Sequence, residues 1–100
     1  MGVIPKRHRS KLRDELLALS AGARPDLLLW VNDYGDHGAV LVPQPDAIWT
    51  HTYTGFDKRS DGSAYGVVPL WTTEESPSDL SAEFEITRDG TVEITNVHVL

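Results

Sequence analysis

The chain has 100 residues, no cysteine and a formal charge of −6 at neutral pH. A domain of this length buries enough surface to fold without disulfides, and the lack of cysteine excludes thiolate metal sites and thiol nucleophiles. Residues 1–25 hold six cationic and two acidic side chains, whereas residues 26–100 hold three cationic and thirteen acidic ones. An acidic body attracts basic proteins and repels phosphate backbones, which disfavours nucleic acid as the main partner.

The basic N-terminal segment is followed by no apolar stretch, and no run in the chain approaches the roughly 18 apolar residues of a membrane helix. We therefore expect a cytoplasmic protein that makes no membrane contact. Residues 1–9 are expected to form a flexible basic arm on a single domain that spans residues 1–100.

The first predicted element is a helix that begins at Pro5 or at Ser10. Proline suits the first helical position, and serine is a competing N-cap. Leucines at helical spacing follow, before a glycine stop at Gly22: Leu12, Leu16 and Leu19. We expect this leucine stripe to pack against a sheet, because a layer of strands cannot bury its own apolar side.

The second predicted element is a short helix over residues 25–35. Pro25 lies where a helix begins and Gly35 lies where a C-cap is expected. Leu27, Val31 and Tyr34 would share one face of it. The length of this segment and its content of β-branched residues do not distinguish a helix from a strand. The positions of Pro25 and Gly35 favour the helix.

Residues 36–62 show no sustained periodicity, and we expect irregular structure there. A short strand near Leu41 is interrupted by prolines, and Asp46 could cap a turn of helix through Trp49. A strand then spans residues 65–72, where Pro69 requires an edge, a bulge or a kink.

The most regular pattern lies in residues 80–100, where apolar and polar residues alternate on both sides of Arg88-Asp89-Gly90. A two-residue loop would set Ile86 across from Glu93 and mix the two faces of the hairpin. A three-residue loop with a left-handed Gly90 pairs Ile86 with Val92 instead. We therefore predict the three-residue loop. The apolar phase shifts after the second strand begins, which predicts a bulge near residues 95–96.

These elements together predict an α+β fold in which two N-terminal helices pack on a C-terminal antiparallel three-strand meander. The core is expected to hold the largest side chains of the chain. These are Trp30, Trp49, Trp71, Tyr65 and Phe84.

The hairpin and the loop before it carry an acidic set: Glu74, Glu75, Asp79, Glu83, Glu85 and Glu93. In the predicted register Glu85 faces Glu93, and a like-charge pair on an antiparallel sheet costs stability. A cationic partner would explain that cost, so the acidic set is the predicted partner-binding surface. The alternative is a solvated sheet face that favours solubility and discourages pairing of sheet edges.

The four histidines show no metal-binding spacing, and no calcium-binding loop is present. There is also no nucleophile elbow and no phosphate-cradling glycine pattern. We expect no catalytic residue, no metal and no cofactor. An alternative pocket between helices and sheet would be lined by Asp33, Asp36, His37 and His51.

The run from Val68 to Leu80, with the Glu-rich strand after it and the ending Val97-His98-Val99-Leu100, resembles a small uncharacterised bacterial α+β domain family. The resemblance covers roughly residues 25–100 and implies no established activity. In size, acidity and lack of cysteine the chain is also similar to immunity proteins of bacterial toxin systems, a likeness that transfers no residue role.

Two functions are consistent with these patterns. The first is a non-enzymatic protein-binding module, an immunity or antitoxin-like protein whose acidic sheet face covers a basic partner such as a toxin. The second is a small-ligand-binding or enzymatic domain of cystatin-like or NTF2-like α+β type, which would use the alternative pocket.

Overall fold

The computed structural model describes residues 3–99. Its first element is the longest helix, α1 (Lys6–Ser20). Pro5 is the N-cap of α1, and Gly22 just after the helix has the left-handed φ of 84° that glycine adopts readily. The buried residues of α1 are the predicted leucine stripe. The first predicted helix is therefore confirmed, with the proline start.

The second helical segment is divided. A 3₁₀ turn, η1 (Pro25–Leu27), is followed by a single turn of α-helix, α2 (Leu29–Asn32). Val31 is buried, and Leu27 and Tyr34 pack against the core from partly exposed positions. The prediction of a helix here is confirmed in kind, but the segment is shorter and less regular than expected.

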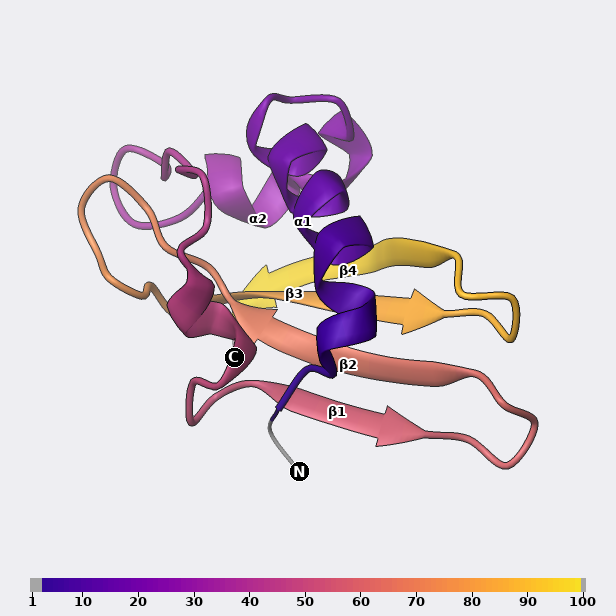
Figure 1. Cartoon of the computed structure of the whole chain (residues 1–100). Helices are drawn as coiled ribbons and strands as arrows, with labels where there is room; N and C mark the ends of the chain where they lie inside the picture. Colours follow the sequence, from indigo (N-terminus) through magenta and orange to yellow (C-terminus); the bar gives the residue numbers. More distant parts are fainter. Residues whose placement is uncertain (1–2, 100) are drawn as a thin grey trace.

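The remaining elements are a second 3₁₀ turn and a sheet. The turn is η2 (Asp46–Trp49), and Asp46 is its first residue while Pro45 is the N-cap. The strands are β1 (Gly55–Lys58), β2 (Ala64–Pro69), β3 (Leu80–Ile86) and β4 (Val92–Val99). They pair in sequence order as one antiparallel sheet (Figure 1).

The sheet has four strands, so the prediction of a three-strand meander is wrong. The additional strand, β1, lies in the segment expected to be irregular. It has only four residues and begins with a glycine, so it carries too little alternation to be recognised locally. Its pairing with β2 supplies the hydrogen bonds that hold it extended. Leu41, in the same segment, forms only an isolated bridge with Thr72.

The β3–β4 hairpin has the predicted register. Ile86 pairs with Val92, the Thr87 amide donates to the Thr91 carbonyl at 2.9 Å, and three residues remain in the loop. Gly90 has a φ of 90°, the left-handed conformation the loop requires. A register shift next to Glu83 leaves Thr95 as the extra residue of β4, which confirms the bulge.

The core lies between α1 and one face of the sheet. Figure 1 shows α1 running across the strands, with its N-terminal end near β1 and β2 and its C-terminal end near β4. Phe84 lies at the centre of this layer and is 1% exposed. On the other face alternate residues remain accessible, among them Tyr65, Glu85 and Glu93.

The large side chains divide between core and surface. Trp49 and Phe84 are buried and Trp71 packs against the core, but Trp30 is 54% exposed and Tyr65 is 42% exposed. The expectation that all five form the core is therefore wrong for two of them. Trp30 precedes the buried Val31 on a single helical turn, and Tyr65 alternates with core-facing neighbours on β2.

The segment expected to be a basic arm makes contacts with the body of the protein. Ile4 is buried, its amide donates to the Trp49 carbonyl at 3.0 Å, and its own carbonyl accepts from Arg9 Nε at 2.8 Å. Residues 6–9 form the start of α1, whereas residues 1–2 lie outside the described part. No helix within residues 3–99 is long and apolar enough to cross a membrane.

Candidate functional site

The face of the sheet opposite α1 collects most of the polar side chains of the strands. Alternation along the strands and the pairing register place the following residues there, and we call this surface the open face: Asp57, Arg59, Tyr65, Val67, Glu83, Glu85, Glu93, Asn96 and His98.

One row across the open face is strongly acidic. Asp57 pairs with Tyr65, Tyr65 pairs with Glu85, and Glu85 pairs with Glu93. The row therefore places three carboxylates and one phenol on neighbouring strands. Paired side chains on an antiparallel sheet lie within about 5 Å at Cβ, so Glu85 and Glu93 repel each other directly. This pairing was predicted from the hairpin register.

A shallow cavity of about 380 Å³ lies beside this row. Its walls come from Tyr65 and Val67 on β2, from Glu83 and Glu85 on β3, and from the bulged Thr95. Gly55 on β1 contributes no side chain, which leaves the floor open next to Val67. The cavity therefore combines an aromatic and aliphatic floor with a carboxylate rim.

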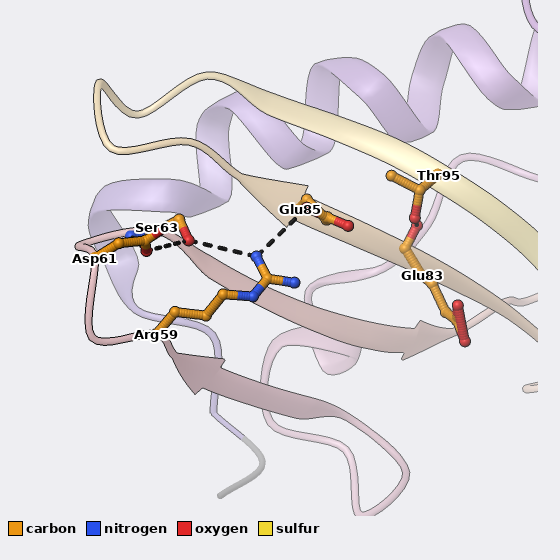
Figure 2. A network of polar contacts seen from close by, with 6 residues as sticks. All are labelled: Arg59, Asp61, Ser63, Glu83, Glu85 and Thr95. Atoms are coloured by element: carbon orange, nitrogen blue, oxygen red, sulfur yellow. Dashed lines mark hydrogen bonds and ion pairs between the residues drawn. The ribbon is translucent and has the colours of Figure 1, made fainter.

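Arg59 contributes a cation to the open face and lines the cavity. Figure 2 shows its side chain directed toward Ser63 and Glu85. Its guanidinium is 4.5 Å from the centre of the Tyr65 ring, and Nη1 is 3.4 Å from Glu85 Oε1. Nη1 also donates to Ser63 Oγ at 3.4 Å, and that hydroxyl donates to Asp61 Oδ1 at 2.6 Å. The side-chain and backbone hydrogen bonds from Ser63 lower the pKa of Asp61.

The contacts of Arg59 are long and exposed. Both Arg59 and Glu85 are exposed side chains, and exposed ion pairs contribute only about 0–1 kcal/mol. An incoming cation could therefore replace Arg59 on Glu85 at little cost. Glu83 has a closer partner, because its Oε2 lies 2.8 Å from His98 Nε2.

The predicted acidic set divides into two groups. Glu83, Glu85 and Glu93 lie on the open face, whereas Glu74, Glu75 and Asp79 belong to the β2–β3 connection. In that connection the Tyr34 hydroxyl donates to Glu75 Oε1 at 2.7 Å and accepts from the Asp79 amide at 3.1 Å. Glu75 and Asp79 are thus tied to the α2 segment, and Glu74 is exposed beside them.

The residues of the alternative pocket are not gathered in one place. Asp33, Asp36 and His37 are exposed in the turns that follow α2. His51 lies instead against Tyr53 and Trp71, with ring centres 4.9 and 5.6 Å apart. Within residues 3–99 no hydrogen bond, ion pair or ring contact joins His51 to the other three.

The sequence did not predict the part of the open face contributed by β1, by the turn after it and by β2, which includes Arg59, Tyr65 and Val67. Alternation along residues 64–69 would have placed Tyr65 and Val67 together on the side away from Ala64 and Val68. Arg59 had no such signal, because it follows a strand that was not predicted. The described residues contain no group of three or more side chains arranged to hold a metal ion.

The fold and the open face define a small α+β domain with one helix-covered and one accessible sheet face. The chain belongs to the family described as "Domain of unknown function (DUF7668)", whose sequence pattern matches residues 3–100. Membership is consistent with the predicted resemblance to a small uncharacterised domain family. Neither a curated protein nor a solved structure matches the chain.

Proposed function

We propose that the protein is a non-enzymatic binding module that presents its open face to a basic protein. The observation that carries the proposal is the direct pairing of Glu85 with Glu93. Two like charges in register cost a few tenths of a kcal/mol or more in the free domain. A cationic side chain placed between them converts this repulsion into two attractions, so the pairing favours a complex.

The neutral part of the open face supports the same proposal. Tyr65 and the adjoining cavity offer an exposed aromatic surface beside carboxylates. Arginine and lysine side chains use such surroundings well, because their stems pack on apolar surface while their charged heads meet carboxylates and aromatic rings. Arg59 already occupies this position within the chain and serves as a model of the cation that would replace it.

An immunity or antitoxin-like role is the specific form of this proposal. A small acidic domain that covers a basic site on a toxin needs no catalytic residues, and long-range attraction would speed its association. Size, acidity and absence of cysteine support this role at the level of composition.

The experiment uses the full chain as bait and measures the affinity of each basic protein it retains. Glu85→Gln with Glu93→Gln removes two charges from the open face. The matched control, Asp33→Asn with Asp36→Asn, removes two charges from the turns after α2, outside that face. We expect at least about a tenfold loss of affinity for the first pair only, and weaker binding as salt is added. Equal losses in both pairs, or no basic protein retained, would overturn the proposal.

A further inference from the structure

A second cavity lies on the helix-covered side of the sheet, and its charge is opposite to that of the open face. It has a volume of about 330 Å³ and lies between the start of α1 and the two hairpin loops, which Figure 1 shows at the same end of the sheet. Cationic and imidazole side chains line it together with an apolar floor: Arg7, His8, Lys58, Arg88, Ala64 and Ile86.

In the part of the chain that the structure describes, the cations that line this cavity form no ion pair with a carboxylate. Among residues 3–99 the ion pairs involve Arg13, Arg24, Arg59 and His98, and none involves Arg7, Lys58 or Arg88. Unpaired cations gathered in one place are unexpected in a chain with fifteen acidic residues. Like charges at short range repel, so their assembly costs stability unless an anion joins them.

The acidic residues of the two hairpin turns form hydrogen bonds within those turns. Asp61, in the β1–β2 turn, accepts hydrogen bonds from the amide and hydroxyl of Ser63. Asp89, in the β3–β4 loop, accepts from the Thr87 hydroxyl and the Thr91 amide. Both carboxylates accept hydrogen bonds within their own turns, and among the described residues neither forms an ion pair with Arg7, Lys58 or Arg88.

Two glycines of the cavity lining lie next to cationic side chains. Arg88 lies over Gly62, whose absent Cβ would be 3.5 Å from Arg88 Cγ. Lys11 Nζ donates to the Gly90 carbonyl at 3.2 Å, which anchors this lysine at the β3–β4 loop beside the cavity. The cations thus come from α1, from β1 and from the β3–β4 loop.

The pKa of His8 reflects the surroundings of its imidazole in the cavity. Its pKa is lowered by burial first and then by the charges of Arg7, Lys58 and Lys11. Its ring also lies near Phe56, with centres 5.9 Å apart. Burial first and the neighbouring cations second thus disfavour the charged imidazolium, and an anion in the cavity would favour it.

The start of α1 adds to the positive potential. No side chain caps the helix, and its first turn contains basic residues and no acidic one. Basic residues at this end oppose the helix dipole, whereas an anion there is favourable. The sequence thus places charge where it destabilises the free helix and would stabilise an anion complex.

We propose that this cavity binds a small organic phosphate, with Arg7, Lys58 and Arg88 around the phosphate and the Ala64–Ile86 floor against its apolar part. Guanidinium groups match phosphate oxygens in two-point hydrogen bonds, and a volume of 330 Å³ suits a small ligand. The acidic body disfavours a long polyanion. This site is separate from the open face and does not depend on the function proposed for it.

The test titrates the full chain with phenyl phosphate and with inorganic phosphate at constant ionic strength, and follows amide and His8 ring signals by NMR. We expect saturable binding that is tighter for phenyl phosphate, because only this probe reaches the apolar floor. Binding should also raise the pKa of His8, since an anion favours the imidazolium. An unchanged pKa of His8 at saturation would overturn the proposal.

Variants locate the site. Lys58→Gln and Arg88→Gln should each weaken binding about tenfold, a loss of about 1.4 kcal/mol. Arg24→Gln is the control, because Arg24 is paired with Asp26 outside the cavity. It removes the same charge and should leave the affinity unchanged. Arg88→Lys should restore only part of the affinity if two-point contact matters. Equal weakening by all variants would show binding to overall charge, and tighter binding of a single-stranded oligonucleotide than of phenyl phosphate would show a nucleic-acid surface. Either result contradicts a small-ligand site.

Discussion

The ring of Phe84 on β3 lies against Gly66, its paired residue on β2, so closely that a Cβ at position 66 would be 2.6 Å from Phe84 Cζ. Glycine in a strand normally costs stability, because it packs no side chain and loses more backbone freedom on folding. Here its small size allows Phe84, the largest fully buried side chain among residues 3–99, to pack directly on the backbone of β2.

Gly66→Ala should therefore destabilise the fold by about 1–3 kcal/mol, as other overpacked substitutions do. The new methyl group would also lie 2.3 Å from the Gly55 carbonyl oxygen, which is backbone and cannot turn away. Gly55→Ala is the control, because its methyl group would meet only Val67 Cγ1 at 3.3 Å. Unfolding in denaturant measures both, and equal losses would contradict a specific contact at Gly66.

Leu16→Ala should cost about 2–5 kcal/mol, the range for a leucine removed from a core. Leu16 is buried between α1 and the sheet, whereas its neighbour Leu17 is 43% exposed. Leu17→Ala changes helix propensity by the same amount as Leu16→Ala, and it should change the free energy of unfolding by no more than about 0.5 kcal/mol. Thermal or denaturant unfolding of the two variants tests whether α1 is docked as described; similar stabilities would show that it is not.

Local sequence patterns predicted the parts of this fold that depend on residues close together in the sequence. The hairpin register followed from alternation and from Gly90, and α1 followed from its leucine spacing. Strand β1 was missed because its four residues become a strand through pairing with β2, a contact that local sequence does not encode. Trp30 was wrongly predicted to lie in the core, because an apolar run on a single helical turn does not show which face of the turn packs against the core.

How much of each site could be predicted also depends on how far apart its residues lie in the sequence. Glu85 and Glu93 were placed opposite each other because a single hairpin holds both. The cationic cavity was not predicted, because Arg7, Lys58 and Arg88 come from a helix, a strand and a loop that meet only in the folded chain. Its one sequence signal was the basic start of α1, which helix stability does not explain.

Glu93→Gln should stabilise the isolated domain by about 0.2–1 kcal/mol, because it removes the repulsion with Glu85. This variant is cleaner than a change at Glu85, since it leaves the contact of Glu85 with Arg59 in place. Glu74→Gln, in the exposed β2–β3 connection, is the control for a general reduction of negative charge. Denaturant midpoints at low salt provide the measurement, and an equal gain in both variants would assign the effect to net charge.

His8 should make the stability of the protein depend on pH in the range below neutrality. Burial and the charges of Arg7, Lys58 and Lys11 lower its pKa in the folded state, while in the unfolded chain it titrates near its ordinary value of about 6.5. The unfolded state therefore binds more protons as the pH falls through about 6.5, so stability decreases on acidification until the folded pKa is passed.

His8→Gln should consequently lose less stability than the wild-type chain between pH 8 and pH 5, because glutamine takes up no proton in either state. Hydrogen bonds lower the pKa values of Asp61 and Asp89, so these carboxylates titrate below this range. They are also common to both proteins, so the difference between the denaturant midpoints of the two proteins isolates His8. His37→Gln, a change at an exposed histidine outside the cavity, is the control.

Added phenyl phosphate should reduce the acid sensitivity of the wild type and leave that of His8→Gln nearly unchanged, since the anion acts on the imidazole by favouring its charged form. Parallel curves for wild type and His8→Gln would show that burial and the cations around His8 do not lower its pKa in the folded state.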